Sequence, residues 1–337
     1  MIIDLRSDTV TRPCNDMRQA MANAVVGDDV YSDDPSVNQL QETLCKLTQK
    51  EAALFMPSGT QSNLVAILSH CQRGEAFIVG SDAHIFKYEG GGSAVLGSTL
   101  PTALPQSANG QIEFELIKKS IKPKDIHFAP MALLCFENTF NGRVVDLTYQ
   151  QDVCHWAKST HGLKTHLDGA RIFNASIETG IAIHDLVSCY DSVSICLSKG
   201  LGAPVGSVLC GSKDFIARAR SWRKMLGGGL RQSGVLASAG LYALDHNVER
   251  LKEDHLHAEL LAKLLMEKGF HLEGNQAHTN MLFIDDTEEK LQKLHQLMEK
   301  NGILIGYYGS GTQLRLVLHK DINEVKFQHI MKVISGY

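Results

Sequence analysis

The sequence predicts an α/β protein with a large N-terminal unit and a smaller C-terminal α/β unit. Short apolar runs that read as buried strands, such as residues 193–195 and 206–210, alternate with segments of helical spacing. Polar residues follow several of these runs, and open α/β sheets place ligand-binding groups at such strand ends. From about residue 250 the pattern becomes helix, strand, helix, strand, strand and helix, which predicts units at residues 1–250 and 251–337.

Composition and charge exclude several classes of partner. The chain has 337 residues, of which 44% are hydrophobic and 21% are charged, as in ordinary globular proteins. Its 33 lysines and arginines against 37 acidic residues give a net charge of −4 without a basic run, so no nucleic-acid partner is expected. The N-terminus lacks the apolar segment of a signal peptide and no run reaches transmembrane length, which predicts a cytoplasmic protein without a membrane partner.

No metal site is expected. The eight cysteines are scattered without a C-x-x-C pair, which indicates neither zinc binding nor a redox motif. The first 50 or so residues read as an arm followed by helices, with an aspartate-rich turn at residues 27–35. Its four aspartates offer oxygen ligands for a cation, but solvated helix caps explain them better, and Pro35 opens a helix.

A strand, a turn and a helix follow at residues 52–68, and the turn carries Ser58, Gly59 and Thr60. The first amides of a helix have no intrahelical partner and the helix dipole is positive there. Hydroxyls and N–H groups at this position therefore favour a phosphate dianion. A plain helix cap is the alternative and is compatible with this function.

His84 follows the next predicted strand, residues 77–80. Its flat ring suits stacking on a pyridine ring and its nitrogens titrate near neutral pH, although a lone histidine is more often structural. Beyond it, the glycine-rich stretch at residues 89–93 reads as a turn. Strand pieces are expected at residues 126–128 and 133–136.

Asp168 and Lys199 point most directly to a cofactor. Asp168 ends a predicted strand, and Lys199 lies on a glycine-rich turn between the strands at residues 193–195 and 206–210. A lysine between core strands is placed to form a Schiff base with a carbonyl, although this stretch alone fits a surface lysine equally well. Together, a strand-end aspartate and a strand-end lysine suit pyridoxal phosphate, whose ring nitrogen needs the acid and whose aldehyde needs the amine.

A glycine-rich loop at residues 227–234 contains Arg231 and precedes a long helix. An arginine on a flexible loop has the reach to contact a phosphate, including one in a neighbouring subunit.

In the C-terminal unit, Arg315 lies on a predicted strand and faces the side opposite Leu314 and Leu316. It is a candidate partner for a carboxylate, with a surface arginine as the commoner alternative. The predicted strands of this unit are residues 281–284, 303–305 and 314–318.

Seven sequence blocks, in order, resemble the low-specificity L-threonine aldolases of the fold-type-I pyridoxal-phosphate superfamily. The blocks are DLRSDTVTRP (4–13), GDDVYSDDP (27–35), PSGTQSNL (57–64), HLDGARIFNA (166–175), CLSKGLGAPVGS (196–207), WRKMLGGGLRQSG (222–234) and LRLVLH (314–319). The resemblance covers nearly the whole chain. It implies a large domain with a mostly parallel sheet and helices on both faces, followed by the smaller C-terminal α/β domain.

The resemblance also implies the site. Lys199 would carry the cofactor, Asp168 would contact the pyridine nitrogen and His84 would stack on the ring. Further cofactor contacts are implied for Gly59, Thr60 and Ser198 at the phosphate, Arg171 near the ring hydroxyl, and Arg231 from a neighbouring subunit. Substrate contacts are implied for Ser7 and Arg315 on the carboxylate, and for Tyr31 and His127 in the pocket lining. The expected assembly is a homo-oligomer, most simply a tetramer, whose sites are completed by neighbouring subunits.

The activity that the resemblance implies is cleavage of L-threonine, L-allo-threonine and related β-hydroxy-α-amino acids to glycine and an aldehyde. In that chemistry Arg315 fixes the substrate carboxylate, a base takes the β-hydroxyl proton and the cofactor ring accepts the electrons. We expect His84 to be the base, directly or through a water, with His127 as the second candidate. Two alternatives stay open: another reaction of the same cofactor, such as β-elimination or transamination, and a non-catalytic binding protein on the same fold.

Overall fold

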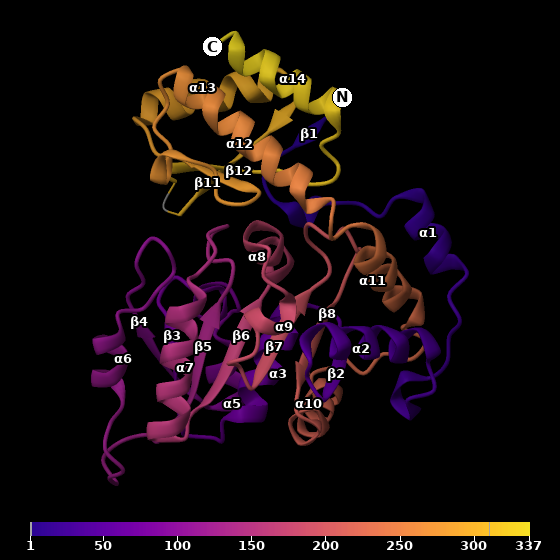
Figure 1. Ribbon diagram of the computed structural model, residues 1–337, viewed down its shortest axis with the longest axis vertical. Coiled ribbons are helices and arrows are strands. Elements are labelled where there is room, and N and C mark those ends of the chain that lie inside the picture. The colour runs from indigo at the N-terminus through magenta and orange to yellow at the C-terminus, as the bar shows by residue number, and fades with distance from the viewer. Residues whose placement is uncertain (1, 310) are drawn as a thin grey trace.

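The larger of two packed units is built on a seven-stranded sheet (Figure 1). The computed structural model describes residues 2–309 and 311–337. In order across the sheet, the strands are β2 (Ala52–Met56), β8 (Ser207–Gly211), β7 (Ser192–Cys196), β6 (Lys164–Gly169), β5 (Met131–Glu137), β3 (Ala76–Gly80) and β4 (Leu100–Leu104). Both pairings of β8 are antiparallel and the other four neighbouring pairs are parallel, so the predicted mostly parallel sheet is confirmed.

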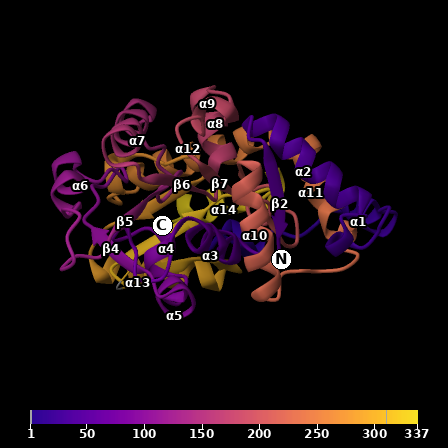
Figure 2. The ribbon, with the colours of Figure 1, turned by 90° about the horizontal axis from the view of Figure 1, so that it is seen from below.

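Helices cover both faces of this sheet, as predicted. Figure 2 shows α7, α8 and α9 on one side of the strands and α3, α4 and α5 on the other. The fully buried strands β3, β7 and β8 fit this arrangement, because a strand covered on both faces reads as a continuous apolar run. The helices of this unit are α1 (Asn15–Ala22), α2 (Pro35–Thr48), α3 (Gly59–His70), α4 (His84–Lys87), α5 (Gly92–Gly97), α6 (Phe114–Ser120), α7 (Leu147–His161), α8 (Ile172–Thr179), α9 (Ile183–Leu186), α10 (Lys213–Met225) and α11 (Gly234–His246), with short 3₁₀ turns η1 (Asp8–Val10) and η2 (Asp29–Tyr31).

The smaller unit packs above the sheet in Figure 1 and contains both ends of the chain. Its antiparallel sheet has the order β11 (Gly306–Tyr308), β12 (Gln313–Val317) and β9 (Met281–Ile284). A parallel pair joins β1 (Ile3–Asp4) to β10 (Ile303–Leu304). The remaining elements are α12 (Leu251–Glu267), η3 (Glu273–Asn275), α13 (Glu288–Lys300) and α14 (Glu324–Ser335).

The first residues of the chain belong to the core of the smaller unit. Ile3 and Leu5 are fully buried in the same hydrophobic cluster as the side chains of α12, α13 and α14. The N-terminal arm belongs to the large unit in the predicted division but packs in the small one. The boundary between residues 250 and 251 stays a prediction. This position of the arm brings Ser7 and Asp8 to the junction between the two units.

Two local predictions were wrong. Residues 126–128 form a turn before β5 and not a strand piece. The glycine-rich stretch after His84 is a turn only as far as Gly91, which adopts φ +66°, and α5 begins at Gly92. At residues 126–128 the apolar side chains are not buried, since Ile126 is 97% exposed and Phe128 is 43% exposed.

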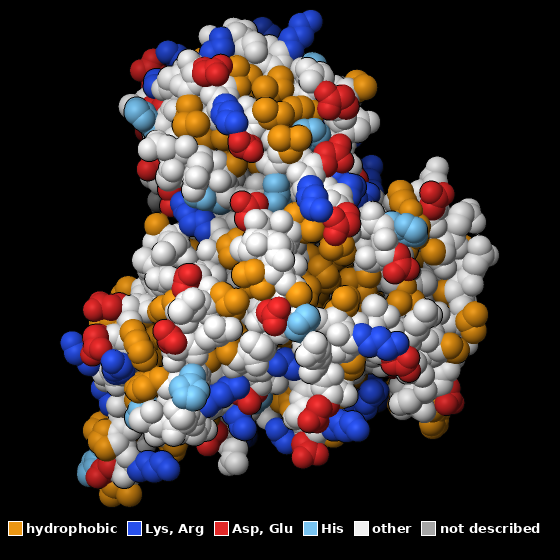
Figure 3. All heavy atoms as spheres, viewed as in Figure 1, with side chains coloured by type: hydrophobic (Ala, Val, Ile, Leu, Met, Phe, Trp, Pro, Cys, Tyr) orange, Lys and Arg blue, Asp and Glu red, His pale blue; other side chains and the backbone are white. Residues whose placement is uncertain are grey.

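The surface carries mixed charge on the face in Figure 3, where lysine and arginine side chains alternate with aspartate and glutamate. Across residues 2–309 and 311–337, no helix has both the length and the apolar character needed to span a lipid bilayer.

Candidate active site

A pocket of about 480 Å³ lies where the carboxyl ends of the parallel strands meet the smaller unit. The loops after β3, β5, β6 and β7 contribute to it from the large unit, and β11 and β12 contribute from the small unit. Its lining residues are Ser7, Thr9, Asp82, His84, Tyr88, Glu137, Asn141, Arg171, Lys199, Met281, Tyr307, Tyr308, Gly309 and Arg315. Five of the residues predicted from sequence, Ser7, His84, Arg171, Lys199 and Arg315, therefore share one cavity.

Lys199 lies on the tight turn between β7 and β8, as predicted. The N–H of Gly202 donates to the carbonyl of Lys199 at 2.8 Å, and Gly202 adopts φ +77°, which L side chains rarely adopt. Thr11 of the N-terminal arm donates its hydroxyl to the same carbonyl at 2.9 Å. The arm and the turn together fix the backbone from which the lysine side chain enters the pocket.

Asp168 and His84 are connected through two residues that sequence reasoning missed, Asn63 and Glu89. Asn63 donates its amide to Asp168 Oδ2 and to Glu89 Oε1, each at 2.8 Å. Glu89 Oε1 also lies 2.9 Å from Nδ1 of His84, and this hydrogen bond raises the pKa of His84. With Nδ1 engaged, Nε2 is the nitrogen of His84 that is left for a ligand.

The oxygen and nitrogen atoms of His84, Glu89 and Asp168 lie within 4.8 Å of one another, a spacing that also suits a metal ion. The amide of Asn63 and the imidazole already bind the facing carboxylate oxygens. We retain the prediction of no metal on this ground.

Glu137 is a further acid of the pocket that the sequence did not single out. It pairs in register with Asp168 across β5 and β6, and its carboxylate accepts the N–H of His84 at 2.8 Å. Burial, together with the neighbouring Asp168, raises the pKa of Glu137 to about 7. Its position at the end of an apolar strand was the available signal, since other acidic and polar residues of the site occupy strand ends.

Arg171 forms a buried ion pair with Asp8 of the N-terminal arm. Its Nε and Nη2 donate to the two carboxylate oxygens, both at 2.7 Å. Burial would raise the pKa of Asp8, but Arg171 outweighs it and holds that pKa at about 2. This pair ties the arm to α8 and presents Arg171 at the cavity wall.

Arg315 reaches the pocket from β12. Its side chain lies 5.1 Å above the ring of Tyr308, and its Nη2 donates to the carbonyl of Arg6 at 2.9 Å. Leu314 and Leu316 are fully buried on the other face of the strand, so the predicted alternation is present. Ser7 caps η1 beside it by accepting the N–H of Thr9 at 3.2 Å.

The start of α3 offers groups that suit a phosphate. The hydroxyl of Ser58 accepts the N–H of Gln61 at 3.1 Å, which leaves the amides of Gly59 and Thr60 at the open end of the helix. A Cβ on Gly59 would lie 3.5 Å from Oγ of Ser207, a buried oxygen without a hydrogen-bond partner among the described residues. Ser198 lies one residue before Lys199 and contacts the sulfur of Cys196 at 3.5 Å. The donor set fits an anion such as the cofactor's phosphate.

The lining of this pocket does not include Asp168 or the predicted phosphate contacts Ser58, Gly59, Thr60 and Ser198. Three further predicted residues of the described chain, Tyr31, His127 and Arg231, also lie outside it. His127 occupies the loop at the amino end of β5, with 76% of its side chain exposed and a contact to Asp125. Tyr31 on η2 is 74% exposed. Arg231 is 56% exposed and pairs with Asp28 at 3.3 Å, and its carbonyl accepts the N–H of Asp29. Their roles stay predictions.

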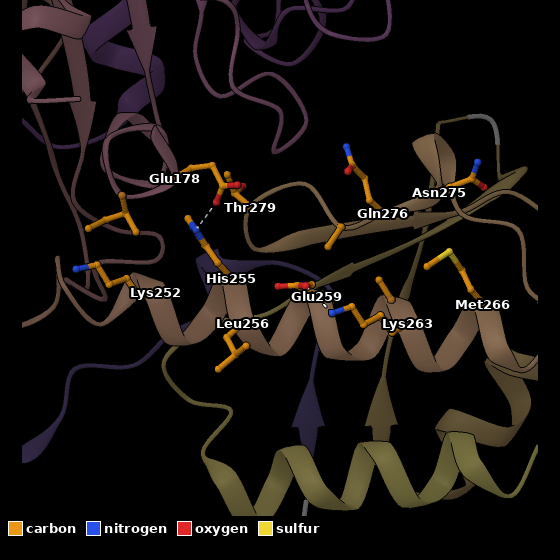
Figure 4. A pocket seen from close by; sticks show the side chains of 13 residues that line it. Glu178, Lys252, His255, Leu256, Glu259, Lys263, Met266, Asn275, Gln276 and Thr279 are labelled. Carbon is orange, nitrogen blue, oxygen red and sulfur yellow. Dashed lines mark hydrogen bonds and ion pairs between the residues drawn. The ribbon is translucent and has the colours of Figure 1, made fainter. Parts of the chain in front are cut away.

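A second pocket, also of about 480 Å³, lies between α12 and the segment before β9 (Figure 4). Figure 4 shows Glu178 of α8 meeting His255 of α12, an ion pair at 3.0 Å. Lysine and glutamate side chains such as Lys252 and Glu259 border it at exposed positions. Within the described chain, none of the predicted site residues lines this second pocket, so the pocket with Lys199 is the candidate active site.

The carboxyl edge of the mostly parallel sheet brings together Lys199, Asp168 and Arg171. This arrangement is typical of the fold-type-I pyridoxal-phosphate enzymes. The family model for the beta-eliminating lyases matches residues 4–287. The low-specificity L-threonine aldolase of Escherichia coli O157:H7 is 49% identical over 329 residues, which cover 98% of this chain and 97% of that protein. Low-specificity L-threonine aldolase 1 of Arabidopsis thaliana is 46% identical, over 95% of this chain and 92% of that protein. The chain belongs to the beta-eliminating lyase family, and its predicted resemblance to the low-specificity L-threonine aldolases is confirmed.

Solved structures agree with this fold. A threonine aldolase of Leishmania major superposes with a TM-score of 0.84 at 20% identity, over 99% of both chains. A putative L-allo-threonine aldolase of Listeria monocytogenes gives a TM-score of 0.79 at 18% identity, over 95% of this chain and 92% of that chain.

Proposed function

We propose that the protein is a pyridoxal-phosphate-dependent lyase that cleaves L-threonine, L-allo-threonine and related β-hydroxy-α-amino acids to glycine and an aldehyde. The observation that carries this proposal is the convergence of Lys199, His84 and Arg315 on one pocket above the buried Asp168. The matching relatives, which are named low-specificity L-threonine aldolases, support the same activity.

The residues present fit the cofactor. Lys199 would carry it, Asp168 would hold the pyridine nitrogen, His84 would stack on the ring, and Arg171 would lie near the ring hydroxyl. Ser58, Gly59 and Thr60 at the open end of α3, together with Ser198 from the turn after β7, would hold the phosphate. The bound ring supplies an electron sink for the bond that breaks.

The protein's own groups would then select that bond and move the proton. Arg315, with the hydroxyl of Ser7 beside it, binds the substrate carboxylate and sets the orientation of the Cα–Cβ bond. His84 takes the proton of the β-hydroxyl at Nε2, because its Nδ1 is engaged by Glu89. The hydrogen bond from His84 to Glu89 favours the charged imidazole and so helps His84 to keep the proton it has accepted.

Substrate stereochemistry tests this arrangement. We predict cleavage of both L-threonine and L-allo-threonine, with discrimination on the order of tenfold to a few hundredfold, as for pockets that judge small groups. Inverting Cα moves Cβ away from the reacting geometry, so D-forms should react about 100-fold more slowly or worse. Rates of glycine and aldehyde formation from the four isomers measure this. Comparable cleavage of a D-form would contradict the carboxylate clamp, and a far larger threo/allo ratio would mean that one base alone serves the hydroxyl.

We also propose a homo-oligomer, most simply a tetramer, in which Arg231, Tyr31 and His127 complete the site of a neighbouring subunit. Each is exposed in the single chain, and Arg231 and Tyr31 belong to one surface joined by the contacts of Asp28 and Asp29. Exposed apolar residues, including Val25, Val26 and Met225, lie within six positions of Tyr31 or Arg231 in the sequence. The eight free cysteines support a reducing compartment, and we propose the cytoplasm.

Subunit hybrids test the shared site. Lys199→Ala and Arg231→Ala subunits should each be inactive alone, and mixing them should restore part of the activity, because a hybrid contains one site with both residues intact. Light scattering and native mass spectrometry would follow assembly and subunit exchange. If exchange is demonstrated and no activity returns, Arg231 acts in the site of its own subunit.

A further inference from the structure

A buried chain of hydrogen bonds runs beneath the pocket from α3 through the sheet. Asn63 is 2% exposed, and both His166 on β6 and Ser192 on β7 are fully buried. The links are His70 to Ser192 (2.8 Å), Ser192 to His166 (2.8 Å), His166 to Asn63 (3.1 Å), and Asn63 to both Asp168 and Glu89 (2.8 Å each).

The two carboxylates determine how the amide of Asn63 is oriented. An ionised carboxylate only accepts hydrogen bonds, so the NH₂ group of Asn63 must face Asp168 and Glu89. Its oxygen Oδ1 then faces Nε2 of His166 and can only accept. His166 must therefore carry its proton on Nε2.

The directions of the remaining hydrogen bonds follow because the two buried histidines are neutral. Burial lowers the pKa of both His166 and His70 to about 3, so each ring has one donor and one acceptor nitrogen at neutral pH. Nδ1 of His166 accepts from the hydroxyl of Ser192, which in turn accepts from Nε2–H of His70. Every donor in this chain points toward the two carboxylates.

The direction of these hydrogen bonds affects His84, the proposed base, through its partner Glu89. Burial raises the pKa of Glu89, and the hydrogen bonds from His84 and Asn63 oppose that rise. The other groups that face His84 are Asp168 of β6, Glu137 of β5, Lys199 of the turn after β7 and Tyr88, the residue that follows α4. Among the described residues, Glu89 is the one that accepts a hydrogen bond from the imidazole ring, whereas Glu137 accepts from the backbone N–H of His84.

We propose that Asn63 is a positioning residue, hydrogen-bonded to His166 on its other side, that holds Glu89 behind the base His84 and Asp168 behind the cofactor ring with a single amide. Asn63 is not one of the residues that line the pocket, so it would act through the two acids. This inference rests on the proposed function for the roles of His84 and Asp168. The hydrogen-bond geometry can be tested in the purified protein without any measurement of activity.

The first test needs no substitution. Nitrogen-15 chemical shifts of selectively labelled histidines in the purified full-length protein report which ring nitrogen carries the proton. We expect neutral Nε2–H forms for His166 and His70 and a protonated Nδ1 for His84. An Nδ1–H form of His166 would mean that Asn63 is turned the other way, which would overturn the proposal.

The second test uses Asn63→Leu. Without the amide, burial of Glu89 is less opposed, Glu89 takes up a proton more readily, and His84 loses its anionic partner. The pKa of His84 should then fall by about one unit or more, the usual effect of losing an opposite charge at this range. The matched control is Gln150→Leu, an equally buried amide on α7 that bonds the carbonyl of Val145 and the hydroxyl of Tyr190.

The same labelled samples measure the pKa of His84 in all three proteins. A fall in Asn63→Leu with none in Gln150→Leu supports the positioning role. An unchanged value in a folded Asn63→Leu protein would reduce Asn63 to a packing residue, and if that variant does not fold, the ring protonation of the unsubstituted protein decides alone. Loss of threonine cleavage with the expected ring protonation intact would count against the proposed function and not against this inference.

Discussion

Replacing Lys199 by alanine is expected to abolish turnover, lowering it by about a thousandfold or more, as the loss of a group that acts in the covalent step does. The purified protein should be yellow, and the variant should lose the visible absorbance of the lysine-bound cofactor. Lys199 is the lysine that lines the pocket, and its backbone is fixed by Thr11 and by the turn at Gly202. Absorbance spectra and the rate of glycine formation measure both effects.

The control is Lys50→Ala, which removes a partly buried lysine that donates to the carbonyl of Tyr190, outside the pocket. That variant should keep its absorbance and most of its activity. Borohydride reduction followed by peptide mapping should place the label on Lys199. A label on Lys213 or Lys224 instead would show that the lysine has been assigned incorrectly.

Asp168→Asn is expected to retain the cofactor and to lose activity by about 100-fold to 1,000-fold, the usual cost of removing one preorganised electrostatic group. A neutral amide cannot hold a protonated pyridine nitrogen, so the ring withdraws electrons less strongly. The substitution also disturbs the site itself, since Asp168 accepts from Asn63 at 2.8 Å and from the N–H of Ala170 at 3.0 Å. The amide group of an asparagine can satisfy only one of these donors with its oxygen.

Asp191→Asn provides the matched control. Asp191 precedes β7, at the other end of that strand from Lys199, where it accepts from the N–H and hydroxyl of Thr165, both at 2.9 Å. We expect near-normal turnover for this variant, together with full cofactor content in both proteins. Near-normal turnover in Asp168→Asn would instead mean that the reaction does not depend on a strong electron sink.

The parts of the fold that local patterns encode were predictable from sequence. Strand β9 occupies Met281–Ile284 as predicted, and Arg315 alternates with buried leucines because a two-residue period is a property of the strand alone. Lys199 and Asp168 were found in the same way, since an apolar run that ends in a polar residue marks the carboxyl end of a buried strand.

The residues that depend on contacts distant in sequence were not predictable. Asn63 reads as an ordinary residue of α3, and it acquires partners only when β6 brings Asp168 and His166 beneath the helix. Glu89 falls in a glycine-rich turn, and only the fold shows that it accepts from His84. Likewise β1 pairs with β10 across some 300 positions of the chain, which no local pattern reveals.

The identity of the products from L-threonine tests the central proposal most directly. Cleavage of the Cα–Cβ bond yields glycine and acetaldehyde in equal amounts, whereas β-elimination yields 2-oxobutanoate and ammonia. All four can be quantified in one reaction of the purified protein, with Lys199→Ala as the blank. We predict equal amounts of glycine and acetaldehyde that depend on Lys199, with Arg315 selecting that bond. Formation of 2-oxobutanoate and ammonia as the main products would contradict the account.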